Sequence, residues 1–222
     1  MFIGFYNYTV YLTYIGLASA VIGMAEAFGG DYKKAVLCLL ICGICDMFDG
    51  TIARTHKKRS EDAKSFGTQI DSLCDVICFG VFPAVIGLSL CPGKWFMQLA
   101  AVFYVLAAVI RLGYFNVQEI NRMGTDEKRE FYLGLPVTSS SLIMPAIALL
   151  TSLDKVNWMY LYPTALIVLG LFFILKVRVK KPYVVGLVCF TAVYIAIIFL
   201  TFKFGGKITC VTEKVIEVAR DV

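Results

Sequence analysis

The sequence predicts an all-α polytopic membrane protein, and three features indicate this fold class. Of its 222 residues, 59% are hydrophobic and only 17% are charged, whereas a soluble domain is about 45–50% apolar and about 25% charged. Apolar segments close to the roughly 20 residues that cross a bilayer as a helix recur along the chain. Within each segment the apolar residues are continuous, without the alternation of a barrel strand, so we expect helices.

We expect six membrane spans and a seventh near the C-terminal end. The first segment has no basic stretch before it and no small-residue cleavage site after it, so we expect a retained helix and no cleaved signal peptide. The polar tail after the seventh segment lies outside the cell if that segment spans the membrane, and inside if it does not. The expected segments are Val10–Phe28, Ala35–Ala53, Ile70–Cys91, Trp95–Val117, Leu135–Leu153, Trp158–Lys176 and Tyr183–Phe204.

Basic residues predict the orientation of these spans. If the loop after the second span is cytoplasmic, twelve basic residues share its side of the membrane and four lie on the other side. The positive-inside rule then predicts a multi-pass protein of the cell membrane with this loop in the cytoplasm. The net charge of +5 accordingly reflects topology and anionic headgroups, and does not indicate nucleic-acid binding. The twelve are Arg54, Lys57, Lys58, Arg59, Lys64, Arg122, Lys128, Arg129, Lys176, Arg178, Lys180 and Lys181, and the four are Lys33, Lys34, Lys94 and Lys155.

Four aspartates interrupt the apolar sequence within the stretch CDMFDGTIARTHKKRSEDAKSFGTQIDSLCD, residues 45–75. Asp46 and Asp49 lie at the cytoplasmic end of the second span, and Asp71 and Asp75 lie at the start of the third. Spacings of three and four place side chains on one face of a helix, and the connecting loop returns the chain to the same membrane surface. Each carboxylate at membrane depth costs about 2.5–3.5 kcal/mol, so a compensating partner is expected.

Divalent cations are the partner that the four carboxylates favour. Hard oxygen ligands suit Mg²⁺, Mn²⁺ or Ca²⁺, and four carboxylates are enough for two metal ions that stabilise a phosphoryl displacement. Gly50 allows close backbone approach, and Arg54 can form a fork onto a phosphate. In the alternative interpretation, the aspartates cap helices or pair with Arg54 and nearby lysines at the interface.

Two motifs together resemble the signature of the CDP-alcohol phosphotransferases: Asp46-x-x-Asp49-Gly50-x-x-Ala53-Arg54 and Gly67-x-x-x-Asp71-x-x-x-Asp75. The stretches QIDSLCDVICFGVFPA (69–84), RLGYFNV (111–117) and FYLGLPVTSSS (131–141) resemble the phosphatidylserine synthase branch. The chain departs from the family in two places. Twelve residues separate Arg54 from Gly67, which is longer than the usual gap, and the asparagine–threonine motif of the first span is matched only in part, near Asn7 and Thr13.

The resemblance implies a fold and a reaction. It implies a six-helix bundle over residues 1–178, an extra C-terminal transmembrane helix with a short polar tail over 179–222, and a homodimer. It implies transfer of the phosphatidyl group of CDP-diacylglycerol to the hydroxyl of L-serine, giving phosphatidylserine and CMP at a cytoplasmic site with two Mg²⁺ or Mn²⁺ ions. By this resemblance Asp46, Asp49, Asp71 and Asp75 bind metal, Asp75 is also the general base, and Gly50, Ala53, Arg54 and Gly67 line the CDP-lipid pocket.

Serine recognition is a separate hypothesis. Arg111 is the only charged residue within the apolar run of the fourth span, and Asn116 follows five residues later. An arginine at membrane depth commonly faces the interior of the bundle, so we expect Arg111 and Asn116 to bind serine. Alternatively, Arg111 extends to the interface or pairs with an aspartate.

Two other functions stay open. One is a sibling transferase with glycerol 3-phosphate or inositol phosphate as acceptor, because the basic residues around 111 and 122–129 suit a phosphate. The other, from a different class, is a divalent-cation transporter, because aspartates within a membrane also mark ion pathways. The position of the aspartates at one membrane face disfavours transport.

Overall fold

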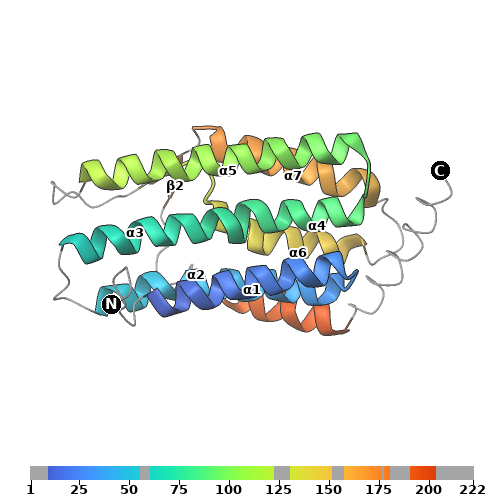
Figure 1. The fold of residues 1–222 in the computed structure, drawn as a ribbon, viewed down its shortest axis with the longest axis horizontal. Coiled ribbons are helices and arrows are strands. Elements are labelled where there is room, and N and C mark those ends of the chain that lie inside the picture. Colours follow the sequence, from blue (N-terminus) through green and yellow to red (C-terminus); the bar gives the residue numbers. More distant parts are fainter. Residues whose placement is uncertain are drawn as a thin grey trace.

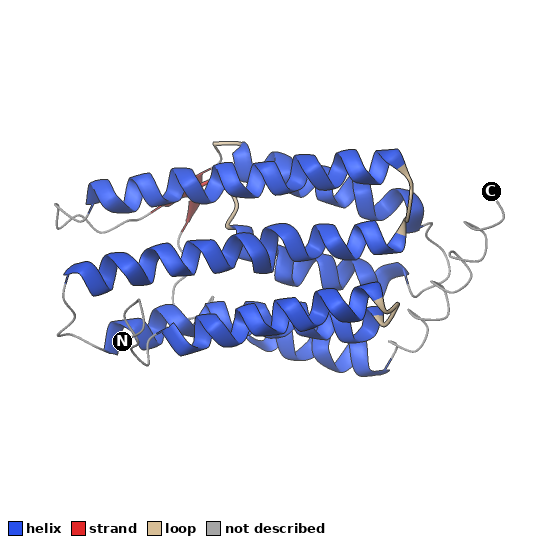
Figure 2. Ribbon diagram, in the orientation of Figure 1, coloured by secondary structure: helices blue, strands red, loops and turns tan. Residues whose placement is uncertain are grey.

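The protein is a bundle of long helices that run along one common axis (Figure 1). A computed structural model describes residues 10–55, 61–122, 131–151, 158–176, 178–180 and 191–203. Almost all of the described chain is helical (Figure 2). The α-helices are α1 (Tyr11–Phe28), α2 (Tyr32–Thr55), α3 (Glu61–Asp75), α4 (Phe82–Leu90), α5 (Trp95–Arg122), α6 (Ser140–Thr151) and α7 (Trp158–Ile174). A further helix covers Thr191–Lys203, and we call it the C-terminal helix.

The helix α3 continues through a π-helix, η2 (Val76–Val81), into α4, so that the three form one rod in the middle of the bundle. On one side of this rod α5 packs on α7, and on the other side α1 packs on α2. The short helix η3 (Val137–Ser139) leads into α6, which contacts α2. Strands β1 (Phe131–Leu133) and β2 (Arg178–Lys180) form a small antiparallel ladder, in which Tyr132 pairs with Val179.

The helices agree with a protein that crosses a membrane several times. Every expected segment contains a helix. Within the described part of the chain, three helical stretches are long and apolar enough to span by length and composition, namely Tyr11–Phe28, Ser65–Leu90 and Trp95–Ile120. Three shorter apolar helices cover Val137–Leu150, Tyr160–Ile174 and Thr191–Lys203. Large apolar side chains such as Leu99, Leu106 and Ile110 are exposed on α5, as expected for a helix that faces lipid.

The starts of the third and the sixth helix differ from the sequence prediction by more than one turn. The third helix begins at Glu61, whereas hydropathy predicts its start at Ile70, because its first turns are polar and still helical. The sixth helix begins at Ser140 and not at Leu135. Gly134 has a φ of 82°, Pro136 is extended, and a proline disfavours helix in the residue before it. The chain therefore enters α6 through β1 and η3.

The turn between α1 and α2 lies at the end of the bundle far from the aspartates. Gly30 has a φ of 83°, which glycine adopts at no steric cost. Asp31 caps α2 by accepting a hydrogen bond from the backbone N–H of Lys34 at 3.0 Å, and its carboxylate pairs with the Lys34 ammonium at 3.1 Å. Partial burial alone would raise the pKa of Asp31, but these bonds from Lys34 outweigh it and hold that pKa below the usual value.

A proline explains the π-helix that follows Asp75. Pro83 has no N–H, so it cannot donate to the carbonyl of Phe79, its partner in a regular α-helix. Two side chains donate instead: the Tyr104 hydroxyl of α5 at 2.6 Å and the Ser140 hydroxyl of α6 at 3.3 Å. The N–H of Phe82 bonds to the Ile77 carbonyl in the wider π pattern. One carbonyl in the central rod, one turn after Asp75, thus joins α5 and α6 to the rod.

Candidate metal centre

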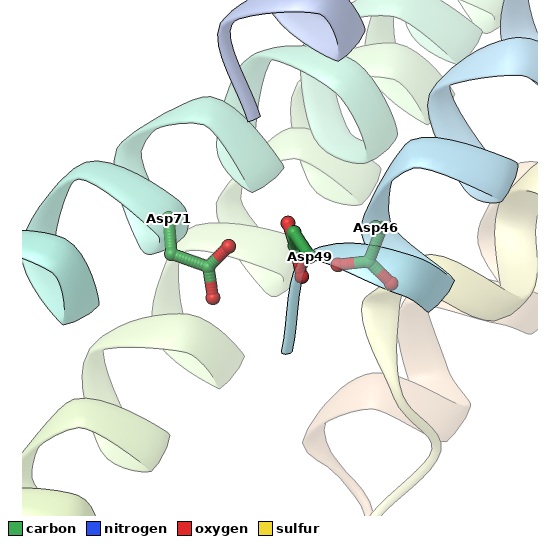
Figure 3. Close-up of side chains that lie close together, drawn as sticks. All are labelled: Asp46, Asp49 and Asp71. Atoms are coloured by element: carbon green, nitrogen blue, oxygen red, sulfur yellow. The ribbon is translucent and has the colours of Figure 1, made fainter. Parts of the chain in front are cut away.

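Three of the four aspartates meet between α2 and α3. One carboxylate oxygen from each of Asp46, Asp49 and Asp71 lies within 4.8 Å of the other two. Figure 3 shows Asp71 reaching from α3 toward Asp46 and Asp49, which both project from α2. Asp49 is buried, with 7% of its surface exposed, and the other two are half-buried. Two helices that are separate in sequence therefore build one carboxylate cluster.

The fourth aspartate lies beside this cluster. Asp75 is half-buried one turn after Asp71 on α3, and its carboxyl is within hydrogen-bonding reach of the Asp46 carboxyl. The spacings of three on α2 and four on α3 place each pair on one helical face, and these faces are turned toward each other. The structure brings Asp46, Asp49 and Asp71 together in one group, and Asp75 follows Asp71 on the same face of α3 outside that group.

The donor set fits a hard divalent cation. Mg²⁺ and Ca²⁺ take carboxylate oxygens at about 2.0–2.6 Å, so oxygens on opposite sides of one ion lie about 4–5 Å apart. The spread within the aspartate cluster is of this size. Without a cation, several carboxylates in a partly dry site repel one another. Asp46, Asp49 and Asp71 are thus a group that could hold a metal ion.

Two neighbouring contacts support the aspartates from other helices. Thr13 of α1 donates a hydrogen bond to Asp49 at 3.4 Å. Ser72 of α3, which follows Asp71 directly, donates a hydrogen bond to Asn116 of α5 at 2.7 Å. The sequence prediction gave Thr13 only a partial motif match and did not include Ser72. The sequence contains a weak signal for Thr13, because it shares one buried face of α1 with Gly16, Ala20 and Gly23.

The residues predicted to bind the CDP-lipid flank the cluster. Gly67 lies one turn before Asp71 on α3 and is half-buried. Gly50, Ala53 and Arg54 lie in the last turns of α2, directly after Asp49. Their side chains fall outside what the structure describes, so their contact with a nucleotide stays a prediction. The backbone nevertheless places all four on the α2 and α3 segments that lead away from the aspartates.

Arg111 and Asn116, the residues predicted to bind serine, both lie on α5. Asn116 reaches the aspartate region through its bond with Ser72. Arg111 is buried, with 7% exposure, and its guanidinium carbon lies 6.0 Å from the centre of the Phe115 ring. Its Nε packs so closely on Gly134 that a side-chain carbon at this glycine would lie 3.2 Å away. The guanidinium is therefore held between α5 and the segment that precedes α6.

The segment that carries these residues matches a known family. Residues 6–133 match the family described as CDP-alcohol phosphatidyltransferase. The chain belongs to this family. The match covers α1 to α5, and with them all four aspartates and the residues that flank them. The signature resemblance that the sequence suggested is thereby confirmed at the level of the family.

Several curated relatives carry related names. A CDP-diacylglycerol–serine O-phosphatidyltransferase of Mycobacterium leprae is 29% identical over 135 residues, which are 59% of this chain and 43% of that protein. One of Helicobacter pylori is 28% identical over 170 residues, which are 72% of this chain and 68% of that protein. An archaetidylserine synthase of Methanothermobacter thermautotrophicus is 32% identical over 107 residues, 48% of this chain and 45% of that protein. The chain spans less than half the length of most curated relatives it matches.

Proposed function

We propose that the protein transfers the phosphatidyl group of CDP-diacylglycerol to the hydroxyl of L-serine, with phosphatidylserine and CMP as products. The observation that carries this proposal is the convergence of Asp46, Asp49 and Asp71 within the family's matched region. The names of the relatives, which include serine transferases from bacteria and an archaeal serine lipid synthase, support serine as the acceptor. The active site faces the cytoplasm, and a six-helix bundle extended by the C-terminal helix holds it in the membrane.

In this reaction the serine hydroxyl oxygen attacks the phosphorus that is bound to diacylglycerol. The new phosphorus–oxygen bond forms as the bond to CMP breaks, and CMP leaves with that electron pair. Asp75 accepts the hydroxyl proton, the role that the resemblance to the family implies for this position. Bound divalent cations, Mg²⁺ or Mn²⁺, supply positive charge that stabilises the pyrophosphate and the departing CMP.

The chain's other residues bind and orient the two substrates. Asp46, Asp49, Asp71 and Asp75 would hold the cations, with Thr13 orienting Asp49. Gly50, Ala53, Arg54 and Gly67 line the nucleotide pocket, while the lipid chains extend into the bilayer. Arg111 binds the serine carboxylate, and Asn116, fixed by Ser72, completes the acceptor site. The location explains why costly carboxylates persist in this membrane protein: cations and a pyrophosphate compensate them.

The test is purified protein with CDP-diacylglycerol and a panel of alcohols, read out as CMP release and as lipid product. We expect CMP release with L-serine and little with glycerol 3-phosphate or inositol phosphate. Excess EDTA abolishes it, and Mg²⁺ or Mn²⁺ restores it. Full activity in EDTA, or equal rates with a phosphorylated acceptor, contradicts the proposal. CDP-archaeol in a parallel reaction identifies the preferred lipid.

The transporter hypothesis is tested with the same preparation. Sealed vesicles that contain the protein should take up no Mn²⁺ beyond protein-free vesicles. Uptake without CMP release would replace the transferase proposal by the transporter alternative.

A further inference from the structure

The C-terminal helix lies outside the stretch that matches the family, yet it packs along the helix that carries two of the aspartates. The Thr191 hydroxyl contacts the Met47 sulfur at 3.8 Å, and the Lys33 ammonium lies 5.4 Å from the centre of the Phe202 ring. Thr191, early in this helix, contacts the later part of α2. Phe202, late in this helix, lies near the start of α2. The C-terminal helix is therefore antiparallel to α2, and Thr191 lies beside the turn of α2 that carries Asp46 and Asp49.

Tyr194 is one of the residues of this helix that are buried in the bundle. Its side chain is buried, with 5% exposure, and its hydroxyl is hydrogen-bonded to the Ser141 hydroxyl of α6. Ser141 has one hydroxyl proton, which it donates to the Thr138 carbonyl at 2.6 Å. Because that proton is already used, Tyr194 is the donor in the bond between the two hydroxyls. The Tyr194 side chain is thus held at one end by the helix that carries it and at the other end by the hydrogen bond of its hydroxyl.

The tip of Tyr194 fills a space that exists only because residue 43 is glycine. A side-chain carbon at Gly43 would collide with the Tyr194 hydroxyl oxygen and with both side-chain atoms of Ser141. Gly43 lies one helical turn before Asp46 on α2. The Tyr194 hydroxyl and the Ser141 side chain therefore pack on the turn of α2 that directly precedes the aspartates.

We propose that Tyr194 is a positioning residue for the metal site. Its hydroxyl, anchored on Ser141, fixes the turn Gly43–Asp46 of α2 so that the Asp46 and Asp49 carboxylates stay in register with Asp71 on α3. Cation ligands on different helices must be held within about 0.5 Å of the productive geometry. The inference rests on the proposed function to the extent that it takes a divalent cation as the ligand of the aspartates.

The test measures Mn²⁺ binding to the full-length purified protein by electron paramagnetic resonance, with no substrate present. Tyr194→Phe removes only the hydroxyl, and we expect the dissociation constant for Mn²⁺ to rise about tenfold, as for other groups that orient metal ligands. Ser141→Ala removes the acceptor and should weaken binding similarly. Saturating Mn²⁺ should restore the transfer rate of Tyr194→Phe, because the residue acts on the site and not on the reacting atoms.

Tyr32→Phe is the matched control. Tyr32 is buried on α2 itself, at the end far from the aspartates, and donates one hydrogen bond to the Ser89 carbonyl at 2.9 Å. It should lower thermal stability by an amount similar to Tyr194→Phe and leave Mn²⁺ affinity unchanged. Wild-type affinity in both Tyr194→Phe and Ser141→Ala, or an equal loss in Tyr32→Phe, overturns the inference.

The result separates this inference from the proposed function. If the wild-type protein binds Mn²⁺ but releases no CMP with serine, the proposed reaction fails while the comparison of the Mn²⁺ affinities still decides the role of Tyr194. If the wild-type protein binds no Mn²⁺, both the metal site and the positioning role are wrong.

Discussion

At the residue scale, the aspartates differ in how far the sequence predicts their surroundings. The spacings between Asp46 and Asp49 and between Asp71 and Asp75 are local. In any α-helix, residues three or four apart lie on the same face, whatever surrounds the helix. The bond from Thr13 to Asp49 depends instead on how α1 packs on α2. The partial motif match at Thr13 is only a weak signal for that contact, so the sequence predicted the cluster more clearly than its support from α1.

Asp75 is expected to be the base, and its amide variant tests this. Asp75→Asn keeps the size of the side chain but accepts no proton, so serine-dependent CMP release should fall by about 10²–10⁴-fold. Mn²⁺ binding should weaken less than in Asp46→Asn, because Asp75 lies outside the tightest group of carboxylates. Turnover and Mn²⁺ titration are measured on the same samples. Wild-type turnover in Asp75→Asn would exclude it as the base.

Arg111 is expected to read the serine carboxylate. Arg111→Lys keeps the charge and loses the planar fork, so the KM for serine should rise more than the KM for CDP-diacylglycerol. Serinol, which lacks the carboxylate, should be a poor acceptor for the wild-type protein and lose little more in the variant. Because Arg111 also contacts Phe115 and Gly134, a structural role would reduce transfer to both acceptors equally, and that outcome would contradict serine binding.

At the element scale, the sequence predicted which segments are helical better than where they begin. Hydropathy reports transfer into lipid, so it misses the polar turns of α3 before Ile70, which are helical without being apolar. Gly134 and Pro136 signal the delayed start of α6, but they lie inside an apolar run that hides them. The π-helix after Asp75 follows from Pro83, and the donors that make it tolerable come from α5 and α6, far along the chain.

The Phe79 carbonyl provides a prediction at this scale. Tyr104→Phe removes its shorter hydrogen bond, and loss of a buried partner costs about 1–3 kcal/mol. Pro83→Ala supplies the N–H that the proline lacks. In the Pro83→Ala background, therefore, Tyr104→Phe should cost clearly less, as measured by thermal unfolding of the four proteins of this double-mutant cycle in detergent. Strictly additive effects would show that the proline is not the reason for the bond from Tyr104.

At the scale of the whole molecule, the helices form one bundle with the aspartates toward the end where α2 stops and α3 starts. The opposite end holds the turn at Gly30 and Asp31. The positions of the aspartates at the ends of the second and third expected spans predicted this arrangement, whereas the charge asymmetry predicts the orientation in the membrane, which stays a prediction. Composition does not encode how the helices are arranged around the central rod, since any apolar helix can pack on any other.

The orientation is a prediction that cysteine labelling checks. Lys58→Cys lies in the loop after α2, beyond the described residues, and Lys94→Cys lies between α4 and α5. In intact cells a membrane-impermeant maleimide should label position 94 and not position 58, and permeabilised cells should label both. Both variants are made in a Cys210→Ala background, which removes the cysteine of the polar tail, and the six described cysteines are buried or half-buried. Labelling of position 58 alone in intact cells would show that the orientation in the membrane is the opposite of the predicted one.

The placement of both aspartate pairs on neighbouring helices has a consequence for biogenesis. The hairpin from Asp46 to Asp75 leaves the ribosome before Asn116, Ser140 or Tyr194 has been translated, and of the supporting side chains only Thr13 precedes it. This hairpin, whose four carboxylates are costly to insert into the membrane, must therefore insert before most of the side chains that surround it have been made. Cation binding lowers the cost of the folded site, so Mg²⁺ or Mn²⁺ should act first on the insertion of this hairpin. We expect cells depleted of these ions to degrade the nascent protein, and not only to make lipid more slowly.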